Sequence, residues 1–289
     1  MFTEVAHDVY VVEHRLVEGK NAIVFGRRGA LAIDACNYAD EGEAMASFIR
    51  SKGCTPDRLA LTHAHGDHIL GSGAFRGADV YAHVAAPRTI EQHLPMWAER
   101  YFGGSRADAE AAIARPNILF SGELRLDLDG KTARLFGTPG HCPDAACAFL
   151  EEDRVLCGGD TVVTGIVPAI ADGDSRQLEV TLRQLVSLAA EVLIPGHGRV
   201  LRGSSVISDH LEWMAAYLGA VRDVVEQYLS EGLEAVLAAA EYSRLVGDRL
   251  PEEPHGMRRR HRLVVSKIFE EVGIERRRLE GQAQHDCER

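Results

Sequence analysis

Short apolar runs bounded by turn-forming residues dominate the first third of the chain, and their length predicts β-strands. The clearest of these runs cover residues 9–12, 21–25 and 30–34. Gly26-Arg27-Arg28-Gly29 separates the last two runs and has the composition of a hairpin turn. Farther along, residues 123–128 alternate between charged and apolar side chains, as a half-buried strand does. A turn at 129–130 is expected to lead into the next strand.

Helical periodicity interrupts these strands and then takes over the rest of the chain. Apolar residues recur at helical spacing from Ser205 onward and within residues 40–52, 175–190, 233–246 and 256–273. The polar tail after Gly281 is expected to be disordered. The order of strands, helix, strands and closing helix predicts two sheets flanked by helices, which is an α/β (α+β) fold.

Composition indicates a large enzyme of the cytoplasm. A chain of 289 residues, 46% of them hydrophobic, can bury a substantial core, and the net charge of −11 argues against a nucleic-acid or anionic-membrane surface. No apolar run approaches the ~20 residues of a membrane helix, and the first residues lack the basic start and apolar core of a signal peptide. The six cysteines form no Cys-x-x-Cys pair, so reduced thiols and a cytoplasmic location are expected.

One heptapeptide carries most of the chemical information in the sequence. It follows the apolar run 59–61 and reads Thr62-His63-Ala64-His65-Gly66-Asp67-His68. Imidazole and carboxylate groups are ligands for borderline divalent metals such as zinc. The first two histidines are two positions apart, so on an extended segment they point the same way. The last two ligands need a turn, and the glycine between them supplies backbone freedom for it.

Three more ligand-type residues follow apolar strands farther along the chain. His141 follows residues 132–136, Asp160 follows 154–157, and His197 follows 192–194. Loops at strand ends are where a rigid scaffold usually presents functional side chains. Seven potential ligands at four strand ends therefore predict a two-metal site.

These residues, in this order, resemble the metal-binding set of the metallo-β-lactamase-fold hydrolase superfamily. The resemblance covers roughly residues 5–230 and implies an αββα sandwich of two mixed β-sheets flanked by helices. It implies a catalytic domain at 1–230 and a C-terminal helical extension at 231–289. It also implies two divalent metal ions, one bound by His63, His65 and His141 and the other by Asp67, His68 and His197, with Asp160 between them.

Residues 86–118 form an insertion that is long for a plain connection between strands. Its aromatic residues predict a lid or pocket wall formed by Trp97, Tyr101 and Phe102, which would favour a partly apolar substrate. The alternative is helical packing against the sheet or against a partner in a homodimer. His255 and His261 are further candidates for substrate contact, because C-terminal helices often border the site in similar proteins.

The ligand set favours hydrolysis. Two zinc ions sharing a hydroxide would supply a nucleophile at neutral pH, and Asp67 and Asp160 are the carboxylates that could orient it. The expected substrate is a small ester, thioester or lactone. Iron or manganese could occupy the same ligands, and Asp34, at the end of an apolar strand, could orient a ligand histidine or cap a turn.

Two other enzyme classes share this resemblance. A β-lactamase-type amide hydrolase would use the same ligands, although such enzymes are usually exported. A persulfide dioxygenase-like oxidoreductase would use a single iron held by two histidines and one aspartate.

Overall fold

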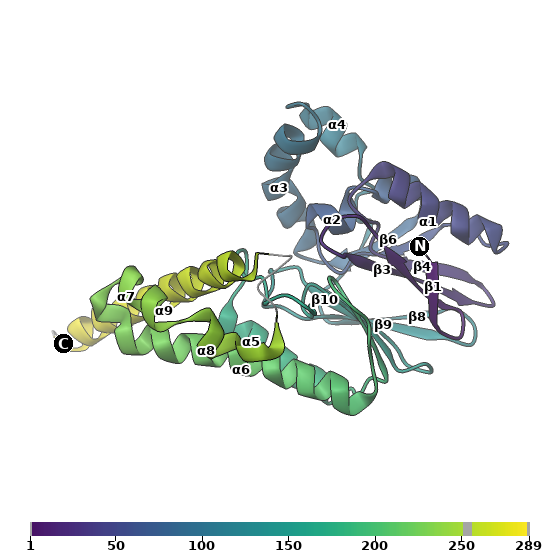
Figure 1. Ribbon diagram of the computed structural model, residues 1–289. Helices are drawn as coiled ribbons and strands as arrows, with labels where there is room; N and C mark the ends of the chain where they lie inside the picture. Colours follow the sequence, from purple (N-terminus) through teal and green to yellow (C-terminus); the bar gives the residue numbers. More distant parts are fainter. Residues whose placement is uncertain (1, 251–255, 288–289) are drawn as a thin grey trace.

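The computed structural model describes residues 2–250 and 256–287, and it contains two mixed β-sheets packed face to face (Figure 1). The first sheet has the spatial order β1 (Phe2–Ala6), β2 (Val9–Glu13), β3 (Lys20–Gly26), β4 (Gly29–Ile33), β5 (Arg58–Ala60), β6 (Asp79–His83) and β7 (Ile118–Phe120). The second has the order β13 (Leu201–Arg202), β12 (Val192–Pro195), β11 (Val155–Gly159), β10 (Ala146–Leu150), β9 (Thr132–Gly137) and β8 (Glu123–Asp127).

Helices cover the outer face of each sheet, which gives the αββα sandwich expected from the sequence (Figure 1). The first sheet is covered by α1 (Ala39–Ser51), α3 (Ala86–Tyr101) and α4 (Arg106–Ala111). The second is covered by α5 (Ser175–Val186) and α6 (Ser204–Tyr228), and α9 (Met257–Cys287) packs against α6. Shorter elements are α2 (Gly66–Ile69), α7 (Leu233–Ala239), α8 (Tyr242–Val246) and the 3₁₀ turns η1 (Ser72–Phe75), η2 (Leu229–Glu231) and η3 (Gly247–Arg249).

The uninterrupted apolar runs reflect burial on both faces of a strand. In β3, Ile23 packs in the cluster beneath α1, while the next residue, Val24, packs in the cluster between the two sheets. Both side chains are completely buried. In the alternating strand β8, the charged side chains are exposed and the leucine side chains between them are half-buried, as the sequence predicts for a strand with one solvated face.

The expected hairpin turn joins β3 to β4, where Gly26 pairs with Gly29, and the predicted helix at 40–52 is α1. Two expectations in the C-terminal region were wrong. The helix predicted at 233–246 is broken into α7 and α8 at Ala240, whose carbonyl accepts a hydrogen bond from His261 Nε2 (2.7 Å). The tail after Gly281 continues α9 as far as Cys287, and one turn earlier Arg276 pairs with Glu280 on its surface.

The topology brings four loops together at one edge of the sandwich. Strands β9 and β11 are both antiparallel to β10, and β12 is parallel to β11, so β9, β11 and β12 end on the same side. The end of β5 joins them through a backbone hydrogen bond between the sheets, from Ala146 N to Thr62 O (2.7 Å). None of the described helices is long and apolar enough to cross a membrane.

Candidate metal centre

The seven ligand-type residues of the sequence converge at this edge in two groups. The first group consists of His63, His65, His141 and Asp160, and the second of Asp67, His68 and His197. Within each group, one nitrogen or oxygen atom per residue lies within 4.8 Å of the others. The heptapeptide supplies four of these residues as the chain leaves β5 and enters α2, and the loops after β9, β11 and β12 supply the others.

Asp160 lies between the two groups. Its Oδ2 is 3.7 Å from His141 Nε2 of the first group, while its Oδ1 is 3.3 Å from His68 Nε2 and 3.4 Å from His197 Nε2 of the second. The groups are also tight internally, since His65 Nδ1 lies 3.0 Å from His141 Nε2. A carboxylate in this position can serve two cations at once.

The donor atoms fit divalent metal ions. His63 Nε2, His68 Nε2 and Asp160 Oδ1 are buried and lack a hydrogen-bond partner among the described residues. A buried polar atom without a partner is destabilising, so atoms that converge in this way indicate a cation-binding site. Imidazole nitrogen and carboxylate oxygen are the donor set that zinc and similar metals bind.

Hydrogen bonds at the far side of each ring fix how these imidazoles are presented. His141 Nδ1 donates to Ala169 O (2.7 Å), and His197 Nδ1 donates to Val17 O (2.9 Å). A carbonyl can only accept, so in both rings Nδ1 carries the proton and Nε2 is left to face the site.

Asp34 plays this role for His68. Of the two roles that the sequence left open for Asp34, orienting a ligand histidine and capping a turn, the structure therefore shows the first. The buried Asp34 carboxylate accepts hydrogen bonds from His68 Nδ1 (2.8 Å), Thr62 N (2.7 Å) and Thr62 Oγ1 (2.7 Å). It therefore holds the beginning of the heptapeptide and one of its histidines in a single contact network.

Electrostatics differ between the two groups. Burial lowers the pKa of His141 to about 4 and the pKa of His63 well below its ordinary value, so both rings are neutral and able to bind metal. For His197, burial is outweighed by the Asp160 and Asp67 carboxylates, which raise its pKa to about 10. For His68, burial is likewise outweighed, first by Asp34, and the pKa is raised. The second group thus holds protons that a metal ion would have to displace.

Comparison with known proteins identifies the fold family. The family model described as the metallo-beta-lactamase superfamily matches residues 17–197, which include all seven ligand-type residues. The chain belongs to this superfamily.

Its relatives are distant. The chain is 27% identical over 187 residues to "Lactamase-like protein nscB" of Arthroderma benhamiae, a match that covers 64% of this chain and 37% of that protein. It is 24% identical over 165 residues to "Beta-lactamase-like protein 2 homolog" of Caenorhabditis elegans, covering 57% of this chain and 50% of that protein. The matched region thus spans half or less of these curated relatives.

Solved structures share the fold at low identity. The sec-alkylsulfatase Pisa1 from Pseudomonas sp. has a TM-score of 0.72 at 17% identity, covering 92% of this chain and 50% of that chain. The metallo-beta-lactamase family protein TTHA1429 from Thermus thermophilus has a TM-score of 0.65 at 18% identity, covering 94% and 95%. The DIM-1 metallo-beta-lactamase has a TM-score of 0.60 at 17% identity, covering 74% and 95%.

Three residues around the superfamily site were not singled out from the sequence, namely Asp144, Asp172 and His93. Asp144 is completely buried, and its carboxylate accepts hydrogen bonds from Ala64 N (2.8 Å) and Thr89 Oγ1 (2.9 Å). Asp172 Oδ2 lies 3.1 Å from His65 Nε2 and 3.6 Å from His93 Nε2. The interactions with the His65 and His93 rings lower the pKa of Asp172. The interaction with Asp172 in turn raises the pKa of His93, although partial burial opposes this.

The aromatic residues of the insertion pack against the core of the first sheet, and none of them is among the residues that line the site cavity. Trp97 is completely buried, so its side chain has no surface to offer a substrate. It packs under the heptapeptide, where a Cβ added to Gly66 would lie only 3.1 Å from Trp97 Nε1. A side chain at this position would crowd Trp97, and Gly66 does not have the left-handed φ for which the sequence suggested backbone freedom. Tyr101 and Phe102 are half-buried against the same core.

His261 does not line the site cavity either. His261 is buried in the helical region, where Nδ1 contacts Tyr217 OH (2.8 Å) and Nε2 donates to Ala240 O. His255 lies outside the described residues.

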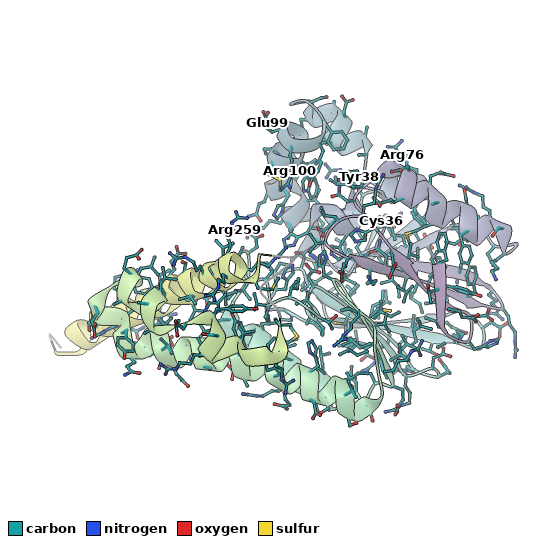
Figure 2. All side chains as sticks on the ribbon, viewed as in Figure 1. Cys36, Tyr38, Arg76, Glu99, Arg100 and Arg259 are labelled. Carbon is teal, nitrogen blue, oxygen red and sulfur yellow. The ribbon has the colours of Figure 1, made fainter. Side chains whose placement is uncertain are left out.

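A cavity of about 220 Å³ opens beside the ligands. One wall is apolar and consists of Val17, Val163, Ile166, Ala169 and Ala171. Arg260 also lines it and comes from the first turns of α9, close to Arg259, which Figure 2 shows at the end of that helix nearest the sheets. The superfamily site therefore combines metal ligands, an apolar wall and a guanidinium group.

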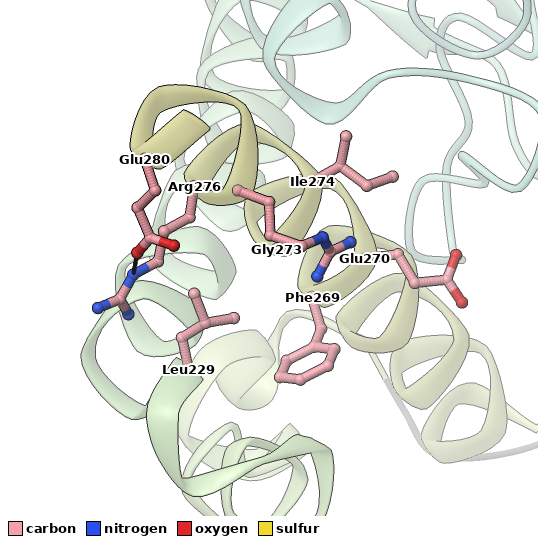
Figure 3. Close-up of a pocket in the computed structure, with 8 residues that line it drawn as sticks. Leu229, Phe269, Glu270, Gly273, Ile274, Arg276 and Glu280 are labelled. Atoms are coloured by element: carbon pink, nitrogen blue, oxygen red, sulfur yellow. Dashed lines mark hydrogen bonds and ion pairs between the residues drawn. The ribbon is translucent and has the colours of Figure 1, made fainter. Parts of the chain in front are cut away.

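A second cavity, of about 430 Å³, lies in the C-terminal helical region between Leu229 and α9 (Figure 3). Its lining shares no residue with the ligand groups, and part of its charge is neutralised by the ion pair between Arg276 and Glu280 (3.1 Å). It offers no chemistry to the metal centre.

Proposed function

We propose that this protein is a two-zinc hydrolase that cleaves an ester, thioester or lactone bond of a small, partly apolar substrate. The observation that carries the proposal is the Asp160 carboxylate, which lies within 3.7 Å of histidines from both ligand groups. A single-iron dioxygenase of the persulfide type needs only one group of three ligands, whereas a second group is present here.

The residues have separate tasks in this proposal. His63, His65 and His141 would hold one ion, Asp67, His68 and His197 would hold the other, and Asp160 lies where it would serve both. Zinc would supply Lewis acidity at the scissile carbonyl and would lower the pKa of water toward 7. Asp67 and Asp160 are the carboxylates that would orient the attacking water by accepting its hydrogen bonds.

The cavity supports a substrate with both apolar and oxygen-rich parts. The wall formed by Val163, Ile166 and Ala169 suits an alkyl or acyl group. Arg260, on the same cavity, suits a carboxylate or another anionic oxygen group, because a guanidinium can donate two parallel hydrogen bonds. This cavity does not select one type of scissile bond. The substrate panel therefore includes β-lactams and a secondary alkyl sulfate together with esters, thioesters and lactones.

The test begins with metal content in protein purified without a metal-affinity tag or chelator. About two zinc ions per chain, with hydrolysis that is lost on chelation and restored by zinc, is the expected result. One iron per chain, with oxygen uptake on a persulfide, would overturn it in favour of the dioxygenase.

Variants locate the chemistry within the same experiment. Asp160→Ala should lose both metal and hydrolysis, while Asp223→Asn, an exposed change on α6, should leave both unchanged. A fully loaded and active Asp160→Ala protein would refute the assignment of Asp160 to both ions.

A further inference from the structure

His65 is the most exposed histidine of the two ligand groups, and its orientation depends on a contact outside them. Its side chain is 18% exposed, compared with 3% for His141 and 0% for His68. Its Nδ1 faces His141 Nε2, while its Nε2 faces Asp172 Oδ2 at 3.1 Å. Because a carboxylate only accepts, Nε2 carries the proton and Nδ1 keeps the lone pair directed at the first group.

Asp172 is itself held by a second histidine. His93 Nε2 lies 3.6 Å from the same Asp172 oxygen, and His93 Nδ1 donates to Thr89 O (2.9 Å) on α3. The His93 ring stacks on the buried Trp97 ring at 5.8 Å and meets the His65 ring edge-on at 5.1 Å. The core of the first sheet therefore fixes His93, and His93 in turn places Asp172.

The loop that carries Asp172 also orients another ligand. Ala169 O, three residues earlier, accepts the hydrogen bond from His141 Nδ1. Two members of the first group, which come from different sheets, are thus oriented by one short segment before α5. His65 receives support from the insertion helix α3 as well.

On this basis we propose that His93 and Asp172 are a pair of positioning residues for His65, through which the α3–α4 insertion controls metal affinity at the first ligand group. The inference rests on the proposed metal assignment of His65. It gives the insertion a role that differs from a lid over the substrate.

Zinc affinity is the direct test, and it does not depend on hydrolysis. Competition with a chromogenic chelator resolves the two binding steps in the wild-type chain, Asp172→Ala, His93→Phe and His93→Gln. Asp172→Ala should weaken one step by about 10–100-fold, the usual effect of removing a partner of a ligand histidine. His93→Phe keeps the aromatic stacking but loses the donor, so it should also weaken that step, and His93→Gln should restore it by donating to Asp172.

The visible spectrum of the cobalt(II)-loaded chain separates positioning from general structural damage. The bands should change in Asp172→Ala and His93→Phe and return toward wild type in His93→Gln. Asp223→Ala serves as a matched loss of an exposed carboxylate and should change neither quantity. Wild-type affinity in Asp172→Ala, or equal affinity in His93→Phe and His93→Gln, would overturn the proposal. Wild-type chain that binds only one zinc ion, or binds two without hydrolysis, would count against the proposed function instead.

Discussion

Replacing Asp34 by asparagine should remove one metal ion without unfolding the protein. In the wild type, His68 Nδ1 donates to Asp34 Oδ2 (2.8 Å), so Nε2, which faces Asp160 Oδ1, is the nitrogen that gives up its proton when a metal ion binds. In Asp34→Asn, the amide oxygen can still accept from Thr62 N, but the amide NH₂ then faces His68 Nδ1. The ring must accept there, and its proton moves to Nε2, the atom that has to bind metal. Rotating the amide instead would set its NH₂ against Thr62 N–H.

The size of the effect follows from this single misplaced donor. Loss of a partner that orients a ligand histidine costs about 10–100-fold in metal affinity. One buried donor without a partner lowers the free energy of unfolding by about 1–3 kcal/mol. Because total stabilities are about 5–15 kcal/mol, the metal-free variant should remain folded.

Zinc stoichiometry at a fixed free zinc concentration measures the outcome, with urea unfolding of the metal-free protein alongside. The expected result is one ion per chain under conditions where the wild type holds two. Asp144→Asn is the matched control: this equally buried carboxylate holds Ala64 N and a hydroxyl of Thr89, and an amide can satisfy both. Two ions bound by Asp34→Asn with wild-type affinity would show that Asp34 does not set the tautomer of His68.

Three further predictions concern the same region. Zinc binding at pH 8 should release protons, because the Asp160 and Asp67 carboxylates outweigh burial and raise the pKa of His197 to about 10. Zinc affinity should therefore rise with pH toward that value. Calorimetric heats that are equal in buffers of different ionisation enthalpy would contradict this. Trp97→Ala should lower the free energy of unfolding by about 3–5 kcal/mol in urea titrations, and the half-buried Trp213→Ala by less, whereas equal losses would argue against core packing of Trp97. Gly196→Ala would place a Cβ 2.0 Å from Asp160 Oδ1, so both zinc ions should bind more weakly, and native affinities in a competition titration would refute that.

Local sequence contained most of what places the ligands. Each segment that carries ligand-type residues comes shortly after an apolar run, and parallel strand directions bring the ends of β9, β11 and β12 to one edge. Within the heptapeptide, the spacing already groups His63 with His65 and Asp67 with His68, although contacts with the distant Asp34 fix how the segment is held. The helices at 40–52 and 175–190 were also predictable from local sequence, because apolar residues at helical spacing mark the face of a helix that is buried.

Contacts between distant segments could not be predicted in this way. Asp172 touches His65 across 107 positions, and nothing near either residue shows which carboxylate meets which imidazole. Trp97 was open to two interpretations because an aromatic residue on a helix is compatible with a core or a pocket until the packing of that face is known. A signal was nevertheless available for His93, which shares one face of α3 with Thr89 and Trp97 at intervals of four residues.

Val17 links backbone strain to the cavity. It has a φ of 50°, a left-handed conformation that a β-branched residue adopts at a cost of about 1–3 kcal/mol. Its carbonyl accepts the hydrogen bond from His197, and its side chain lines the cavity. Glycine at this position would make the chain more stable and at the same time remove an apolar contact for the substrate. Stability and substrate selection therefore oppose each other in this loop, and variation at residues 16–18 should alter substrate preference while the ligand side chains stay unchanged.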